Sequence, residues 1–153
     1  MDVVIDTEGQ WPDAVERILR GLPDWFGIEE SLLDYVENSR TLPTTTARIH
    51  DEIVGVCVVR HHNPRSVEID LLAVRLDLHR RRIGHQMLDH VEAGLRAAGV
   101  RLFHVKTYGP SGNSPEYERT RAFYEAYGFV ALEENTAIWG PGNPCLMLVK
   151  PLD

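Results

Sequence analysis

Residues 67–107 read VEIDLLAVRLDLHRRRIGHQMLDHVEAGLRAAGVRLFHVKT, and the hydrophobic pattern changes twice within them. The first eight residues are mostly apolar, which predicts a strand over 67–74. Apolar residues then recur at helical spacing from about 82 to 98, and Gly99 follows as a natural C-terminal stop. A second strand is predicted over 102–107. A strand, a crossover helix and another strand predict a βαβ unit with two parallel strands.

The segments on either side of this unit predict further elements of both kinds. Helical spacing predicts helices over 12–21, 28–38 and 115–126. Short β-rich runs predict strands over 44–50, 52–61, 129–133 and 146–150. The strands before the central helix are expected to form an antiparallel meander. No linker or internal repeat interrupts the chain, so we predict a single mixed α/β domain over 1–153.

Composition excludes several classes of protein. Apolar residues make up 43% and charged residues 25% of the chain, as in soluble globular domains. No run approaches the ~20 apolar residues of a membrane span, and the first residues lack the basic flank of a signal peptide. Cys57 and Cys145 form neither a disulfide framework nor a zinc site. We therefore predict a cytoplasmic protein with no metal and no membrane partner.

Charge is distributed unevenly along the chain. Residues 1–55 hold 12 acidic and 4 basic residues, whereas residues 75–101 hold 6 basic and 3 acidic residues. A basic island in an acidic chain predicts a local anion site, not a nucleic-acid surface, because a duplex binder is usually basic over a whole face. The acidic first third suits a cationic partner, although a solvated surface explains it equally well.

The basic island lies where the predicted strand passes into the long helix, at His79-Arg80-Arg81-Arg82-Ile83-Gly84-His85. The N–H groups and the positive dipole end of a helix N-terminus bind phosphate, and Gly84 allows a ligand close to the backbone. The Gly-Lys-Ser/Thr element of a P-loop is absent, and only one glycine of a dinucleotide fingerprint is present. A solvated basic turn is the simpler alternative.

Two blocks resemble the GNAT superfamily of acyl-CoA-dependent N-acyltransferases. The first is Leu71-Leu72-Ala73-Val74 with the later run from His79 to Leu88, and the second is Arg121-Ala122-Phe123-Tyr124-Glu125-Ala126-Tyr127-Gly128-Phe129. The resemblance covers roughly residues 3–150 and implies a central mixed, mostly antiparallel sheet with splayed parallel strands and flanking helices. In the family motif, Gln/Arg-x-x-Gly-x-Gly/Ala, His79 and Arg82 replace the first and the middle residue, and Gly84 keeps its place.

The resemblance also implies a site for coenzyme A. The pyrophosphate would lie against His79, Arg80, Arg81, Arg82, Ile83, Gly84 and His85. The pantetheine arm would hydrogen-bond to the strand edge at Leu72, Ala73 and Val74 as an added strand does, with a backbone N–H near Leu72 facing the thioester carbonyl. For this edge to be available, the two parallel strands must separate beside Val74.

The implied reaction is direct transfer of an acetyl group from acetyl-CoA to a primary amine. Tyr124 matches the family position of the acid that protonates the departing thiolate. Glu68 and Asp70, two residues apart on one strand face, are the candidate bases. His61 and His62 are alternatives to them, and ordered water is a third possibility. Trp25, Phe26 and His61 are expected to contact the acceptor.

The acceptor stays open between a polyamine, an aminoglycoside-like compound, an amino acid and a protein amine, with a small cationic amine favoured by the acidic first third. The alternative function is a catalytically weak acyl-CoA-binding sensor or interaction module. A homodimer is expected at the level of the family only.

Overall fold

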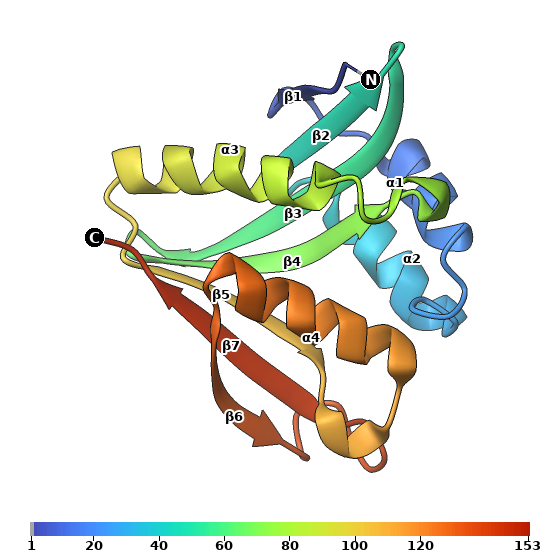
Figure 1. The fold of residues 1–153 in the computed structure, drawn as a ribbon, viewed down its shortest axis with the longest axis vertical. Helices are drawn as coiled ribbons and strands as arrows, with labels where there is room; N and C mark the ends of the chain where they lie inside the picture. Colours follow the sequence, from blue (N-terminus) through green and yellow to red (C-terminus); the bar gives the residue numbers. More distant parts are fainter. Residues whose placement is uncertain (1) are drawn as a thin grey trace. The chain divides into compact units, whose positions relative to one another are not determined.

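The computed structural model describes residues 2–153, and Figure 1 shows how their helices and strands follow one another. The strands are β1 (Val4–Asp6), β2 (Thr44–Ile49), β3 (Glu52–Asn63), β4 (Ser66–Val74), β5 (Leu102–Tyr108), β6 (Val130–Asn135) and β7 (Cys145–Pro151). The α-helices are α1 (Pro12–Arg20), α2 (Glu29–Asn38), α3 (Ile83–Ala97) and α4 (Pro115–Tyr127), and two 3-10 turns are η1 (Leu76–Leu78) and η2 (Pro110–Gly112).

The strands follow the order β1-β2-β3-β4-β5-β7-β6 in a mixed sheet with one parallel pair. This confirms the predicted mixed α/β class. Every predicted helix and strand is present within a few residues of its expected bounds. Two features differ from the expectation. β1 was not predicted, because its three residues are too few to show a period, and β3 continues past His61 to Asn63.

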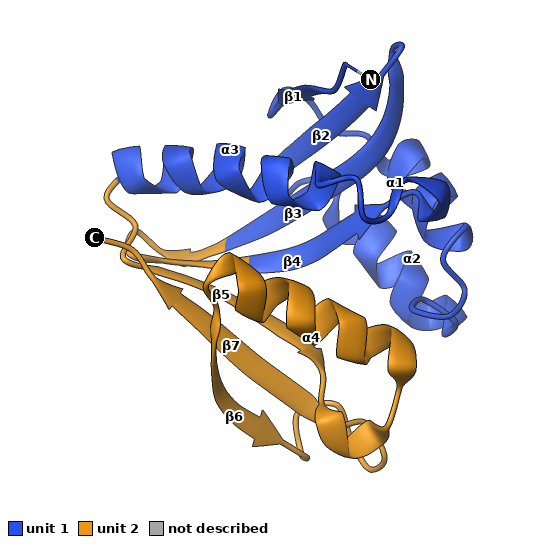
Figure 2. Ribbon diagram, in the orientation of Figure 1, with its two compact units in different colours: residues 1–60, 69–98 blue, residues 61–68, 99–153 orange. Residues whose placement is uncertain are grey.

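The chain divides into two compact units, coloured separately in Figure 2. Unit 1 comprises residues 1–60 and 69–98, and unit 2 comprises residues 61–68 and 99–153. Each unit has its own apolar packing. Among residues 2–153, no helix is both long and apolar enough to cross a membrane.

In unit 1, helices cover both faces of the strands. Buried side chains of α1 and α2 pack in one cluster with Val56 and Val58 of β3. α3 lies on the opposite face. Gly55 faces away from Val56 on β3, and a Cβ at Gly55 would meet the side chain of Met87 of α3. α3 thus rests on apolar contacts along one side, and its N-terminal end follows η1 directly.

In unit 2, α4 packs on one face of the antiparallel strands β5, β7 and β6. The rings of Phe103 and Tyr124 each lie 5.4 Å from the ring of Phe129. Gly128 ends α4 at a φ of 121°, a left-handed conformation that favours glycine. Along β5, buried Phe103, Val105 and Thr107 alternate with the less buried His104 and Lys106, which therefore share the other face.

Candidate active site

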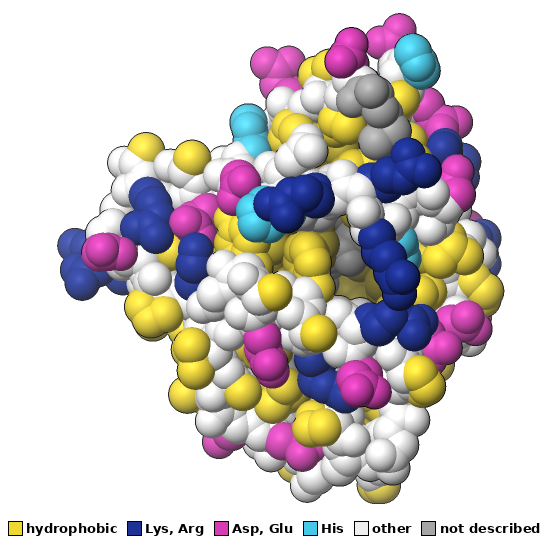
Figure 3. All heavy atoms as spheres, in the orientation of Figure 1, with side chains coloured by type: hydrophobic (Ala, Val, Ile, Leu, Met, Phe, Trp, Pro, Cys, Tyr) yellow, Lys and Arg dark blue, Asp and Glu magenta, His cyan; other side chains and the backbone are white. Residues whose placement is uncertain are grey.

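The segment between β4 and α3 holds the predicted anion site in an irregular backbone. Arg80 and Arg82 have φ values of 66° and 62°, in the left-handed region. All three arginines, Arg80 to Arg82, are exposed, and basic side chains (dark blue) gather over this segment in Figure 3. Two left-handed residues in an alternating series turn successive backbone groups toward one side, as anion-binding loops do.

The N-terminus of α3 carries the polarity that an anion requires. Arg82 is its N-cap residue, and no side chain caps the helix. The Gln86 N–H donates to the Arg82 carbonyl at 3.0 Å, so the amides of Ile83 and Gly84 precede the first intrahelical bond. Together with the arginines, this helix end can receive phosphate oxygens.

His79 is placed by contacts inside unit 1. Its Nε2 lies 2.8 Å from the Val74 carbonyl oxygen, and since a carbonyl only accepts, this nitrogen carries the proton. Its ring also meets the edge of the Trp25 ring, with centroids 5.5 Å apart. The His79 side chain therefore ties the end of β4 to the α1–α2 connection, while its backbone remains next to the anion segment.

Arg75, which precedes η1, is engaged elsewhere. Its guanidinium donates to Asp77 at 2.7 Å and also pairs with Glu52. The hydrogen bond from Arg75 holds the pKa of Asp77 below its ordinary value. The three later arginines, Arg80 to Arg82, are the exposed cations of this segment, and their contact with an anion stays a prediction.

The predicted pantetheine edge is the last part of β4. Ala73 is buried, whereas Leu72 and Val74 are partly buried and point to the other face of the strand. The Arg75 N–H donates to the Val54 carbonyl at 2.8 Å, which ends the strand against β3. Separation of β4 from its parallel neighbour stays a prediction.

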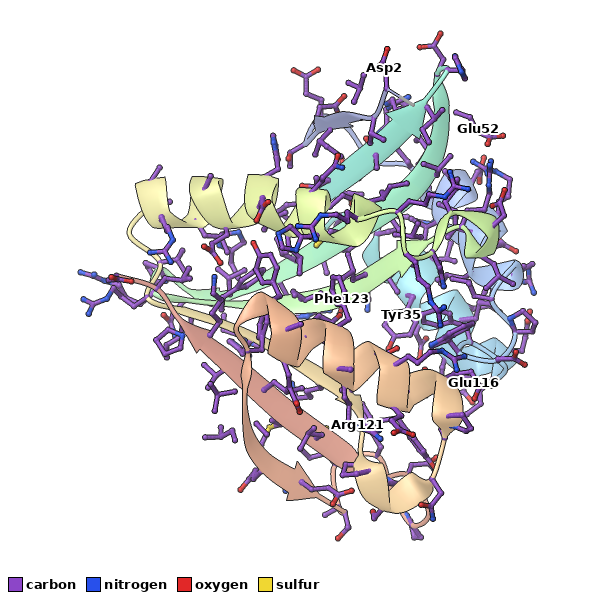
Figure 4. The ribbon with its side chains drawn as sticks, in the orientation of Figure 1. Asp2, Tyr35, Glu52, Glu116, Arg121 and Phe123 are labelled. Carbon is purple, nitrogen blue, oxygen red and sulfur yellow. The ribbon has the colours of Figure 1, made fainter. Side chains whose placement is uncertain are left out.

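Trp25 and Phe26 lie in the turn between α1 and α2, as expected. Both are partly buried against the apolar cluster of unit 1, and the Phe26 ring lies edge-on to the Tyr35 ring at 5.7 Å (Tyr35 is labelled in Figure 4). Both side chains therefore keep some exposed surface. Asp24 lies in the same connection and Glu30 in the first turn of α2, and both are exposed.

The two predicted carboxylates, Glu68 and Asp70, have different partners. In unit 1, Asp70 lies 3.5 Å from Arg60 Nη2 and 3.5 Å from Asn38 Nδ2. In unit 2, Glu68 accepts from Lys106 Nζ at 2.9 Å and lies 2.7 Å from His62 Nε2. Neither carboxylate is a plain surface charge.

Electrostatics make Glu68 a weak proton acceptor. Burial raises its pKa, but the hydrogen bonds from Lys106 and His62 outweigh burial and hold the pKa below its ordinary value.

His61, predicted to contact the acceptor, is exposed on β3, and alternation directs it to the face opposite His62.

Tyr124 occupies a buried position on α4, with 4% of its surface exposed. Its ring lies 5.4 Å from the rings of both Phe123 and Phe129 (Phe123 is labelled in Figure 4). The ring therefore contributes to packing in unit 2, which does not conflict with a role for its hydroxyl. That role stays a prediction.

The cysteines do not suggest a covalent intermediate. Cys57 is fully buried in β3, and burial raises the pKa of its thiol to about 12. Burial also raises the pKa of Cys145 at the start of β7. Two neutral, buried thiols are poor nucleophiles, which fits direct transfer of the acyl group.

Three polar residues near Glu68 were not singled out by sequence: Ser66, His104 and Lys106. Ser66 Oγ lies 2.9 Å from His104 Nε2, and the rings of His104 and His62 stack with centroids 5.3 Å apart. A signal was available, since His and Lys alternate with apolar residues along the strand 102–107. Which carboxylate they meet depends on strand pairing, which the local pattern does not contain.

Comparison with known proteins agrees with this arrangement. The sequence model of the acetyltransferase (GNAT) domain matches residues 42–131, more than half of the chain. The chain belongs to the GNAT acetyltransferase family. It is therefore a transferase, as the resemblance implied. A comparison with curated proteins gave no match.

Solved structures share the fold over nearly the whole length. A GNAT-family protein of Desulfovibrio desulfuricans is 20% identical, with 98% of this chain and 99% of that chain covered and a TM-score of 0.85. An aminoglycoside 6'-N-acetyltransferase in complex with coenzyme A is 16% identical, with 97% and 96% covered and a TM-score of 0.77. A GNAT acetyltransferase of Elizabethkingia anophelis with acetyl-CoA bound is 19% identical, with 98% of each chain covered and a TM-score of 0.71.

Proposed function

We propose that this acetyltransferase moves the acetyl group of acetyl-CoA directly to the primary amine of a small cationic acceptor. The observation that carries the proposal is the start of α3. A helix end without a side-chain cap follows three exposed arginines, two of them in left-handed conformation. This arrangement suits the phosphates of coenzyme A, which are the anionic part of the donor.

The donor would lie along β4 from its phosphates to its thioester. Its pantetheine amides would pair with the backbone of Leu72 to Val74 as an added strand does. A backbone N–H near Leu72 would polarise the thioester carbonyl and stabilise the oxyanion that forms on attack. When the carbon–sulfur bond breaks, the Tyr124 hydroxyl would protonate the thiolate.

The acceptor class is inferred from charge near the α1–α2 connection. Residues 1–55 carry 12 acidic and 4 basic residues, and both Asp24, next to Trp25 in the chain, and Glu30, in the first turn of α2, are exposed. Aromatic faces and carboxylates together bind ammonium groups well. A small amine with a second positive charge is the acceptor that this surface supports best.

The test uses purified protein, acetyl-CoA and pairs of amines of equal length. Each pair compares a diamine with the amino alcohol in which a hydroxyl replaces the second amine. Release of free thiol and the mass of the product are followed for every compound. We expect faster thiol release with the diamine of each pair.

Two outcomes would contradict the proposal in different ways. Equal rates for diamine and amino alcohol would contradict the proposed preference for a cationic acceptor. If coenzyme A raises the melting temperature but no amine releases thiol, the protein is a binding module, since ligand binding alone stabilises the fold.

Two further expectations accompany this function. We propose a cytoplasmic location, where buried free thiols such as Cys57 and Cys145 stay reduced. We also expect a homodimer, which size measurement of the purified protein in solution would decide.

A further inference from the structure

Four side chains in unit 2 form a cluster that the proposed function does not yet use. We define the histidine–carboxylate cluster as His62, Glu68, His104 and Lys106. His62 and Glu68 flank the turn between β3 and β4 and meet across it, while His104 and Lys106 share one face of β5. Glu68 Oε1 lies 2.7 Å from His62 Nε2, and Glu68 Oε2 accepts from Lys106 Nζ at 2.9 Å.

The carboxylate of this cluster is poorly suited to accept a proton. Both of its oxygens are occupied, and only 11% of the Glu68 side chain is exposed. The amine acceptor must lose a proton from an ammonium whose ordinary pKa is about 10.4. A carboxylate held in the charged form by Lys106 accepts such a proton at a large energetic cost.

The imidazole of His62 is better placed for this role. Because an ionised carboxylate only accepts, His62 Nε2 carries the proton of the 2.7 Å bond, and its Nδ1 keeps a lone pair. The His62 side chain is 42% exposed, so water or an amine can reach it. Stacking on His104, whose Nε2 lies 2.9 Å from Ser66 Oγ, restricts the orientation of the ring.

We propose that His62 accepts the proton of the acceptor ammonium and that Glu68 is its positioning residue. This inference rests on the proposed function. Glu68 is on β4, the strand that also carries the predicted donor edge at Leu72 to Val74, and His62 reaches Glu68 from β3. Lys106 keeps Glu68 ionised, and the ionised Glu68 stabilises the imidazolium that forms.

The protons and electron pairs balance without any further reactant. His62 Nδ1 takes one proton from the ammonium, directly or through one water, and the neutral amine attacks the thioester carbon. The carbon–sulfur bond breaks as the amide forms, and the proton lost by the amide nitrogen goes to the thiolate through Tyr124. The imidazolium then releases its proton to solvent, so one proton is produced for each acetyl group transferred.

The groups that face His62 within unit 2 act on its charge in opposite directions. Glu68 favours the imidazolium, whereas Lys106 and a charged His104 disfavour it. Burial lowers the pKa of His104, which favours its neutral form. Cys145 interacts electrostatically with both Lys106 and Glu68, and burial raises the pKa of its thiol, which favours the neutral thiol. Glu68 therefore contacts His62 directly, and Lys106 is held against the other oxygen of Glu68.

The pH profile of kcat/KM, measured between pH 5 and 9 with an active amine, tests the proposed roles of His62 and Glu68. We expect the wild-type profile to rise and then level off, as a titrating base requires. His62→Gln should lower kcat/KM about 100-fold at pH 7 and abolish the plateau, so that the rate follows the free amine alone. Glu68→Gln should move the rise to lower pH, and Lys106→Met should move the rise to higher pH.

His50→Asn is the matched control, since His50 is an exposed histidine in the β2–β3 turn at a φ of 50°, which Asn tolerates. It should leave the profile unchanged. NMR titration of the His62 ring in the wild type and in both charge variants gives the same shifts without turnover.

Each result bears on a separate claim. A plateau that survives His62→Gln would contradict the role of His62 as proton acceptor. NMR shifts of equal sign in Glu68→Gln and Lys106→Met would contradict the role of Glu68 as its positioning residue. Neither result would contradict the proposed acetyl transfer. A wild type that binds coenzyme A but acetylates no amine would overturn the proposed function, and the role of His62 as proton acceptor with it.

Discussion

Arg82 occupies a backbone conformation that favours glycine, and replacing it should stabilise the fold. Its φ of 62° and ψ of 16° lie in the left-handed region, at the N-cap of α3. In this region the Cβ of an L-residue crowds the following carbonyl oxygen. Glycine has no Cβ, and it also occupies this position in the motif that the sequence resembles. Arg82→Gly therefore removes strain without disturbing the helix.

The size of the effect follows from two opposing contributions. Relief of the left-handed conformation is worth about 1–2 kcal/mol. The greater freedom of glycine in the unfolded chain costs roughly 0.4–1 kcal/mol. The net gain in the free energy of unfolding is about 0.5–1 kcal/mol, which corresponds to a rise in Tm of roughly 1–4 °C for a chain of this length.

Arg81→Gly is the matched control, because it removes the same charge from the adjacent exposed residue. Arg81 is absent from the positive-φ residues, so glycine brings only the entropic cost there, and Tm should fall. Thermal and denaturant unfolding of both variants give the stability change. Affinity for coenzyme A, measured by calorimetry at low salt, should fall in both, since each loses one cation.

Arg82→Gly should raise Tm and Arg81→Gly should lower it, and the opposite signs distinguish backbone strain from loss of charge. If both variants shift Tm in the same direction, the left-handed backbone at Arg82 is not a source of strain. If Arg82→Gly stabilises the fold and leaves coenzyme A affinity intact, the Arg82 side chain takes no part in the phosphate site.

Three further results are expected. Gly84→Val should reduce coenzyme A affinity at least 10-fold by blocking close approach of the phosphates to the backbone. An unchanged Kd in calorimetry would show that the phosphates do not bind at this segment. Tyr124→Phe should lower kcat more than it changes KM, because the ring packing is kept, and equal losses in both would indicate a packing role. The pKa of Glu68 is lowered in the folded state, so its contribution to stability is present above the ordinary carboxyl pKa and is lost as pH falls through the folded value. Lys106→Met should flatten this dependence in denaturant titrations between pH 3 and 7, and an unaltered slope would show that the pair does not lower the pKa.

Much of the candidate site could be predicted from local patterns. A strand, a basic segment and a long helix follow one another between residues 67 and 98, and their periodicities differ enough to be separated by sequence. The anion segment could be predicted because a helix start, its glycine and its arginines are neighbours in the chain. The buried position of Tyr124 agrees with the apolar and aromatic spacing of residues 121–129.

Other roles depend on contacts between residues distant in sequence. The side chain of His79 belongs with the phosphate segment by position, yet its ring bonds to Val74 and meets Trp25, 54 positions earlier. Glu68 and Asp70 look equivalent on one strand, but Glu68 pairs with Lys106 and His62, whereas Asp70 pairs with Arg60. Likewise, β7 pairs between β5 and β6 although it follows both in the chain.

The amino-acid sequence by itself determined the α/β class and the family, and it predicts the anion segment, because each arises from residues close together along the chain. Only the tertiary structure decided which side chains face Glu68, namely His62 and Lys106. The physical reason is that hydrophobic periodicity sets the type of an element within a few residues. Strand register and order, which bring Lys106 of β5 to a carboxylate of β4, are set by packing across the whole sheet.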